Sequence, residues 1–248
     1  MPPPPSPGIA RRHHQVGQTA VTILAEERFH QAAVSAISSA REEIERFISH
    51  DPLFRDTLEP YHEPRGAPDV VKAMCAAARR AGVGPMAAVA GAIAQEAVRA
   101  MVGAGAKHAV VDNGGDIALF LDREVDVGIY AGDSPLRDMA LRVPPQRRHL
   151  AICTSSGTVG PSISFGIADA AVVLAADAAL ADACATRLGN EAQSQDEGGM
   201  AYALDVIMEI EGVEGAMLVV GGRVALRGRL PQLVRGKVGE DSIARRRY

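Results

Sequence analysis

The chain has 248 residues and a formal net charge of −4 at neutral pH. A domain of this length buries roughly 70–75% of its unfolded surface, so one sizeable core is expected. The slight negative charge removes the electrostatic argument for nucleic acid or an anionic membrane as the main partner. Aromatic residues make up only 4% and Trp is absent, so the core must be packed by Ala, Val, Ile and Leu.

The two ends of the chain differ in composition from the rest. Residues 1–12 are predicted to form a disordered, Pro-rich tail and residues 237–248 a flexible basic tail, which leaves one domain over 13–236. The start lacks the features of a secretory signal, and no apolar run has transmembrane length. Three widely spaced cysteines in apolar surroundings favour buried thiols in a reducing compartment. We therefore expect a cytoplasmic protein.

The amino-terminal half contains one strand and three helices by its hydrophobic periodicity. These elements are predicted over 18–25, 27–49, 67–81 and 86–102. A connection with four prolines, 51–68, separates the first two helices, and loops of such length often lie near a site.

The carboxyl-terminal half is richer in strands, each bounded by Gly, Asp, Asn or Pro. Strands are predicted over 107–111, 116–121, 125–130, 139–143, 150–154 and 170–175. A helix around Asp182, a helix over 199–208 and a hairpin of 216–220 with 223–226 complete the chain. Because no βαβ repetition is present, we predict a single α+β domain with an antiparallel or mixed sheet core and flanking helices.

One segment of small helix-forming residues carries Asp182 and Thr186 four positions apart. On a helix this spacing places both side chains on one face, about 6 Å apart at Cβ. A carboxylate and a hydroxyl are part of the oxygen shell that Mg²⁺ or Ca²⁺ accepts, and they are too few to hold Mg²⁺ without phosphate oxygens and water. The pattern indicates a metal–nucleotide site, and the alternative is an Asp that caps the helix.

Two loops carry further candidate binding residues. The sequence Asn113-Gly-Gly-Asp116 is typical of a tight turn, and its glycines would also let a flat or phosphorylated ligand approach bare amides. The sequence Cys153-Thr-Ser-Ser-Gly157 offers three adjacent hydroxyls to a phosphate or ring edge, although such a loop start is equally common without a ligand. Ser/His/Asp catalysis lacks its elbow motif, and Cys153 has no basic neighbour to activate it. No catalytic residue is assigned.

In order along the chain, four segments resemble the motifs of the FAD:protein FMN transferase (ApbE) superfamily, as in an uncharacterised cytoplasmic branch of ApbE-like proteins. The segments are 84–91, 113–116, 154–157 and 181–186. The resemblance implies Mg²⁺ held by Asp182 and Thr186, and FAD as the cofactor. It also implies a flavin pocket formed by Asn113, Gly114, Gly115, Asp116, Thr154, Ser155 and Ser156. In these transferases FMN passes to a Thr or Ser hydroxyl of an acceptor protein.

The chain departs from the transferase pattern at three positions. The transferases usually carry a Lys where this chain has Ala90, a His implicated in catalysis where it has Pro161, and an Asp near Ser164. A proton-transfer group contributes on the order of 10²–10⁴ in rate. The resemblance therefore predicts binding of a flavin nucleotide, FAD or FMN, with Mg²⁺, and FMN transfer that is very slow or absent.

Two interpretations stay open at this point. The chain is either a flavinyl- or phosphoryl-transfer enzyme of modified mechanism, or a non-catalytic flavin-binding or interaction module on the same scaffold. Its expected partner is a small nucleotide or flavin, with a protein acceptor or a second copy of the chain as open possibilities. A small molecule that copurifies with the protein would separate these interpretations.

Overall fold

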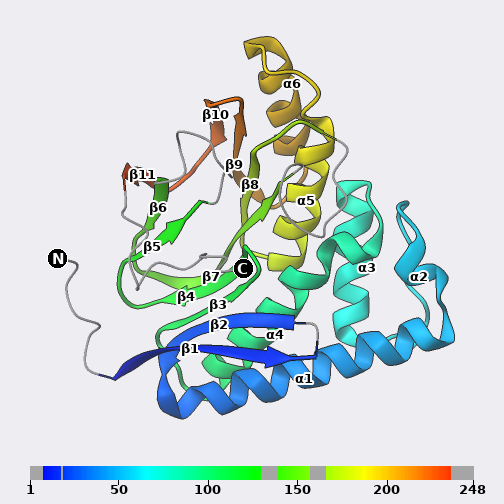
Figure 1. The fold of residues 1–248 in the computed structure, drawn as a ribbon. Helices are drawn as coiled ribbons and strands as arrows, with labels where there is room; N and C mark the ends of the chain where they lie inside the picture. Colours follow the sequence, from blue (N-terminus) through cyan, green and yellow to red (C-terminus); the bar gives the residue numbers. More distant parts are fainter. Residues whose placement is uncertain (1–7, 18, 130–138, 157–165, 236–248) are drawn as a thin grey trace.

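The computed structural model describes residues 8–17, 19–129, 139–156 and 166–235. Its centre is an eight-stranded sheet with the order β1-β2-β3-β4-β7-β8-β9-β10, in which every neighbouring pair is antiparallel (Figure 1). The strands are β1 (Ile9–Val16), β2 (Thr19–Glu26), β3 (Ala109–Asn113), β4 (Asp116–Leu121), β7 (Gln146–Ser155), β8 (Ala170–Ala175), β9 (Val213–Val220) and β10 (Arg223–Gly228).

Helices cover one face of this sheet (Figure 1). They are α1 (Glu27–His50), α2 (Leu53–Asp56), α3 (Asp69–Ala81), the 3₁₀ helix η1 (Pro85–Ala88), α4 (Val89–Gly103), α5 (Ala178–Glu191) and α6 (Glu197–Met208). The first strand pair leads directly into the long α1, which packs against α4. Buried side chains of the helices and of the sheet face that they cover, mostly Ala, Val, Ile and Leu, form the larger of two hydrophobic cores.

A small second sheet covers part of the opposite face. It has the order β11-β6-β5, from β11 (Gln232–Arg235), β6 (Met139–Val143) and β5 (Val125–Gly128). Side chains of alternate residues on the central strands point to this side, as the two-residue period of a strand requires, and they build the smaller core with Val127, Leu141 and Val143. The central strands are therefore buried on both faces.

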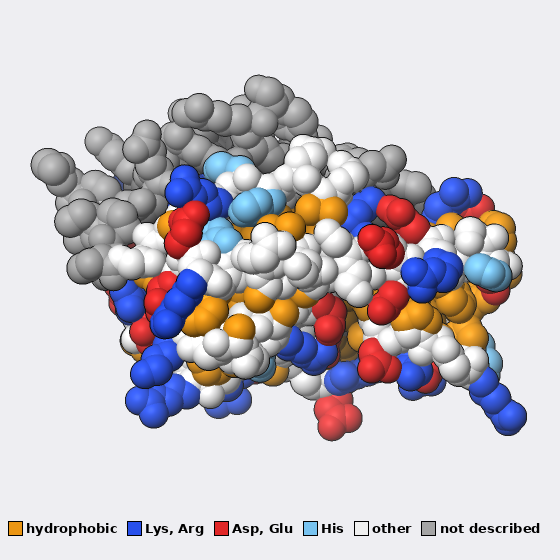
Figure 2. Space-filling view, turned by 90° about the horizontal axis from the view of Figure 1, so that it is seen from below, with side chains coloured by type: hydrophobic (Ala, Val, Ile, Leu, Met, Phe, Trp, Pro, Cys, Tyr) orange, Lys and Arg blue, Asp and Glu red, His pale blue; other side chains and the backbone are white. Residues whose placement is uncertain are grey.

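The outer side of the molecule near α1 carries charges of both signs. Figure 2 shows basic and acidic side chains interspersed there rather than separated by sign. Ion pairs such as Arg41 with Glu45, one helical turn apart, account for part of this pattern. Among the described residues, no single helix is both long and apolar enough to cross a membrane. Helix α3 passes that test only together with 85–103, as a pair bent by 106°.

The α+β prediction is confirmed, and several boundaries need correction. Residues 9–12 are not a tail: they belong to β1, whose register with β2 runs from Ile9 opposite Glu26 to Val16 opposite Thr19. This edge strand was missed because its polar side chains, among them His13 bonded to Thr22 at 2.9 Å, hide the apolar pattern of a strand. Strand β7 begins at Gln146 rather than at 150, and β11 and α2 were not expected. Tyr130, the expected end of β5, lies outside the described residues.

Candidate functional site

Three of the four sequence segments meet at the first turn of α4. The backbone N–H of Gly91 donates to Oδ2 of Asp182 at 2.8 Å. The side-chain amide of Asn113 donates to the carbonyl oxygen of the preceding residue, Ala90, at 3.1 Å. The turn between β3 and β4 and the helix α5 are thus both tied to Ala90 and Gly91.

Gly91 is required by the close approach of α4 and α5. A Cβ atom at this position would lie 2.1 Å from the carbonyl oxygen of Ala178 and 2.8 Å from Cβ of Asp182. Contacts this short do not occur between real side chains, so only glycine lets the two backbones come together. The small-residue face of α4, which the sequence indicated, therefore lets α5 pack closely against it.

A buried glutamine fixes the start of α5 beside Gly91. Oε1 of Gln95 accepts the N–H of Ala178 at 2.6 Å, and Nε2 lies 3.4 Å from Oδ2 of Asp177. Asp177 is the N-cap of α5, since its Oδ1 accepts the N–H of Leu180 at 2.9 Å. The capping alternative for Asp182 is therefore wrong, because Asp182 lies in the second turn of a helix that is already capped. Sequence reasoning missed Gln95 and Asp177; the available signal was a Gln that follows a run of small and apolar residues at the start of the helix.

The sequence Asn113-Gly-Gly-Asp116 forms the tight turn between β3 and β4. Gly114 and Gly115 have φ values of 73° and 108°, which side-chain-bearing residues rarely adopt. The N–H of Gly115 donates to Oδ1 of Asp112 at 2.8 Å, and its carbonyl accepts the N–H of Thr154 at 3.2 Å. The expectation of bare glycine amides is thus wrong for Gly115, whose N–H is already bonded within the turn.

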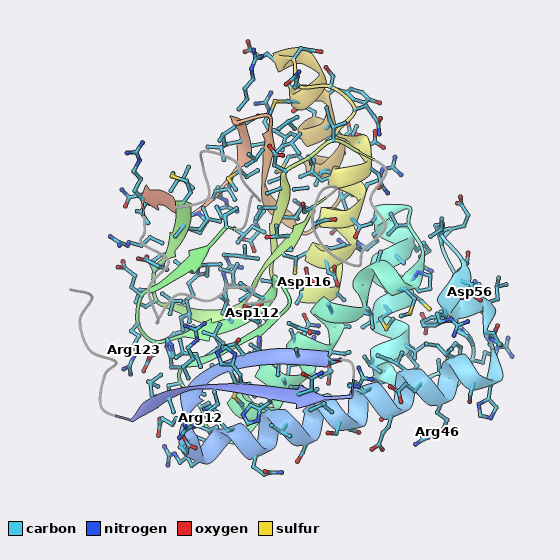
Figure 3. The ribbon with its side chains drawn as sticks, in the orientation of Figure 1. Arg12, Arg46, Asp56, Asp112, Asp116 and Arg123 are labelled. Carbon is cyan, nitrogen blue, oxygen red and sulfur yellow. The ribbon has the colours of Figure 1, made fainter. Side chains whose placement is uncertain are left out.

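The half-buried Asp116 and the buried Asp182 form a carboxyl pair where this turn meets the helix layer. Asp182 is only 8% exposed, and Asp116 is the charged group that acts most strongly on it. Burial first, and the charge of Asp116 second, raise the pKa of Asp182 well above its usual value, against the opposing effect of the N–H groups of Gly91 and Ala90. Figure 3 labels Asp116 at this junction, with Asp112 further along the same hairpin.

The thiol of Cys153 lies next to the carboxyl pair. Cys153 is the cross-strand partner of Asp116, and its Sγ lies 3.6 Å from the carbonyl oxygen of Ala178, to which the thiol donates. Burial, followed by the charges of Asp116 and Asp182, raises the pKa of this thiol. The thiol is thus kept protonated, which agrees with the expectation that it is no nucleophile.

The expected hydroxyl groups of β7 lie on both of its faces, because Thr154 is opposite Val172 of the smaller core whereas Ser155 shares the face of Cys153. Ser155 is 6% exposed and its Oγ has no hydrogen-bond partner within the described ranges. Thr154 and Ser156 are half-buried, and Thr186 is half-buried one turn after Asp182. Pro161 and Ser164 lie outside the described residues.

The donors gathered here are oxygen atoms of carboxylates and hydroxyls. Such a set fits a hard cation such as Mg²⁺ better than Zn²⁺, which favours nitrogen and sulfur. In the part of the chain that the structure describes, no group of three or more His, Cys, Asp or Glu side chains is placed to hold a metal. A cation at this site would therefore need ligands beyond the carboxylates, from hydroxyls, water or a bound phosphate.

The arrangement of sheets and helices is the fold of the ApbE flavin transferases. The flavinyl transferase ApbE of Pseudomonas stutzeri, in its apo form, superposes with a TM-score of 0.56 at 12% identity, covering 88% of this chain and 93% of that one. The ApbE protein of Thermotoga maritima superposes with a TM-score of 0.58 at 13% identity, covering 93% and 97%. At such low identity the likeness shows the fold alone.

Sequence comparison defines the family more closely. The family model described as "AbpE bacteria" matches residues 5–226, and the chain belongs to this family. A UPF0280 protein of Methanocella arvoryzae is 52% identical over 232 residues, which are 94% of each chain. A UPF0280 protein of Archaeoglobus fulgidus is 48% identical over 243 residues, covering 96% of this chain and all of its own. The resemblance drawn from four short motifs is confirmed at the level of the family.

Proposed function

We propose that this protein binds a flavin nucleotide, FAD or FMN, together with Mg²⁺, where the β3–β4 turn meets the first turns of α4 and α5. The observation that carries the proposal is the carboxyl pair of the half-buried Asp116 and the buried Asp182, beside the backbone N–H groups of Ala90 and Gly91. Two adjacent carboxyl groups away from water either share a proton, in line with the raised pKa of Asp182, or bind a cation. Solved proteins of the same fold are named flavin transferases, which supports a flavin as the nucleotide.

Asp182 and Thr186 are the residues proposed to hold the cation, since both offer oxygen donors from adjacent turns of α5. Mg²⁺ in this position would supply neutralisation of phosphate charge. The proposed flavin pocket comprises Asn113, Gly114, Gly115, Asp116, Thr154, Ser155 and Ser156. Asn113 and Thr154 contribute by holding the turn, through their bonds to Ala90 and Gly115.

The proposal concerns binding and leaves the chemistry as a prediction. The position at which transferases carry their His is Pro161 here, and slow or absent FMN transfer stays a prediction from the sequence. The three free, buried cysteines support the cytoplasm as the proposed compartment.

A thermal shift experiment tests the proposal. FAD with Mg²⁺ at a hundredfold excess over the dissociation constant stabilises the folded state by about 2.7 kcal/mol, or roughly 5–10 °C for a domain of this size. We expect this shift for FAD or FMN with Mg²⁺ and its loss on addition of EDTA. A shift that EDTA leaves unchanged would contradict the metal assignment, and no shift with either flavin would contradict the proposal as a whole.

A further inference from the structure

Strand β1 is held at the edge of the large sheet with little help from buried side chains. It packs against β2 and α1 (Figure 1), and all eight of its residues are half-buried or exposed. The turn end of the β1–β2 hairpin is fixed by Arg41 of α1, which donates to the hydroxyl of Thr19. The rest of β1 depends on the side chains that face α1, and segments with few buried apolar contacts open at a low free-energy cost.

His14 is one of the side chains that join β1 to α1. It lies opposite Val21 in the β1–β2 pair, and Val21 belongs to the larger core, so His14 points to the helix side of the sheet. There its ring lies against that of His30, with the two ring centroids 5.9 Å apart. His30 is only 5% exposed. The edge strand therefore meets the helix through two imidazole rings.

The hydrogen bonds of these rings limit the protons that they can carry. Nε2 of His30 lies 3.2 Å from the carbonyl oxygen of Ala25 and donates to it, because a carbonyl can only accept. Nδ1 of His30 and Nε2 of His14 are both shut off from solvent and have no hydrogen-bond partner in the described part of the chain. The two rings can share one proton between them. A second proton would create a further buried N–H that lacks an acceptor.

The charges around His14 also oppose a second proton. Arg12 and His13 lie on the same strand, His30 and Glu27 belong to α1, and β2 presents an apolar side chain opposite His14. Burial first, followed by the charges of His30 and Arg12, lowers the pKa of His14, whereas Glu27 raises it. The carboxylate of Glu27 is already paired with Arg12 at 3.4 Å. Because the folded strand keeps His14 neutral below its ordinary pKa of 6.5, the contact loses stability as the pH falls through that value.

We propose that the contact between His14 and His30 is a pH-sensitive switch: it holds β1 against α1 while the pair carries at most one proton, and it releases the strand when a second proton binds. The release falls between about pH 7 and pH 5, where histidine ordinarily changes its charge. Release exposes the edge of β2, whose Thr22 is bonded to His13 and paired with Asp112 of the β3–β4 hairpin. The inference does not depend on the proposed function.

Hydrogen–deuterium exchange of the full chain tests the proposal. Exchange rates of the amides of β1 are measured at about pH 7.5 and about pH 5 and divided by the intrinsic rates at each pH, which gives protection factors. In the wild type we expect the protection of β1 to fall by about threefold or more at the lower pH, since one unit of pKa difference corresponds to a tenfold change in an equilibrium. Protection of the central strands β8 and β9 should stay the same.

Three variants assign the effect to the pair. His14→Gln removes the titrating group and can still donate to Nδ1 of His30, and His14→Phe keeps a ring in the contact, so in both the protection of β1 should no longer depend on pH. His13→Gln is the matched control. Its side chain bonds to Thr22 on the other face of the strand, so this variant should lose protection at low pH as the wild type does.

Two results would overturn the inference: a wild-type β1 whose protection is the same at both pH values, or His14 variants that lose protection at low pH as the wild type does. If both His14 variants release β1 already at pH 7.5, NMR titration of the wild type decides the question. The ring signals of His14 and His30 must then change over the same pH interval as the protection of β1, and titration outside that interval would contradict the switch.

Discussion

At the scale of single residues, burial decides the chemistry of the three thiols. It raises the pKa of Cys75 to about 11 and that of Cys184 to about 12, and together with the charges of Asp116 and Asp182 it raises that of Cys153 well above its ordinary value. All three cysteines are free and buried. Since the thiolate is the reactive form, none of them is placed for nucleophilic or redox chemistry in the folded protein.

The thiols should therefore react only as the protein unfolds. We expect Ellman's reagent to label fewer than one thiol per chain at pH 8 in native conditions and three in guanidinium. Because the folded pKa values lie above the ordinary 9.0, the thiols lose protons first in the unfolded chain. The free energy of unfolding should accordingly fall as pH rises above about 9. Rapid labelling of Cys153 in the native protein would contradict this account of its surroundings.

The residues of the site were predictable to different degrees. The spacing of Asp182 and Thr186 indicated a shared helix face, because helical geometry alone sets that relation. The proximity of Asp116 to Asp182 was not predictable, since it depends on the register of β4 with β7 and on the position of α5 against the sheet. The bond from Gln95 to Ala178 joins elements 83 positions apart, a relation that only tertiary packing creates.

At the scale of elements, the site depends on how closely α4 lies against α5. Gly91 permits that distance, and the N–H it presents to Asp182 is available because it begins a helix. Gln95 and Asp177 fix the same pair of helices one turn further on. The contacts that pack α4 against α5 therefore also position the site, and a change in the spacing of these helices changes both.

Two glycines of α4 provide a paired test of this point. Gly91→Ala forces a Cβ into the carbonyl of Ala178, so it should lower the free energy of unfolding by about 1–3 kcal/mol. Gly103→Ala, near the end of the same helix and with open space around it, should be neutral or stabilising by up to about 1 kcal/mol. Chemical denaturation with urea measures both. Equal effects of the two substitutions would show that the close approach of α4 and α5 does not require a glycine at Gly91.

Elements with a regular hydrophobic pattern were predicted well, and edge elements were not. Strands β4, β6 and β8 have the expected bounds because continuous or alternating apolar residues mark strands that are buried. Strand β1 lies at the edge of the sheet and carries Arg, His and Gln, so its sequence resembles a polar tail. Strand β11 has four residues and, within the described ranges, pairs with β6 alone, a contact that no local signal reveals.

At the scale of the whole molecule, the central sheet separates two cores and carries the site at the turn of the β3–β4 hairpin. The helix side holds the carboxyl pair, and the second sheet closes the opposite face. The turn residues 113–116 thus connect the site to strands that are buried on both sides. This placement gives the candidate site a rigid base, as precise ligand positioning requires.

The central claim is that Asp182 binds a metal–nucleotide ligand and does not stabilise α5. The most direct measurement is calorimetric titration of FAD, with and without Mg²⁺, into the wild type, Asp182→Asn and Asp177→Asn. Asn can accept the N–H of Gly91 in place of Asp182, and it is an equally good cap in place of Asp177. We predict that Asp182→Asn weakens Mg²⁺-dependent FAD binding at least about tenfold while the free energy of unfolding stays within about 1 kcal/mol. Asp177→Asn should bind as the wild type does. Unchanged affinity and unchanged Mg²⁺ dependence in Asp182→Asn would contradict the account.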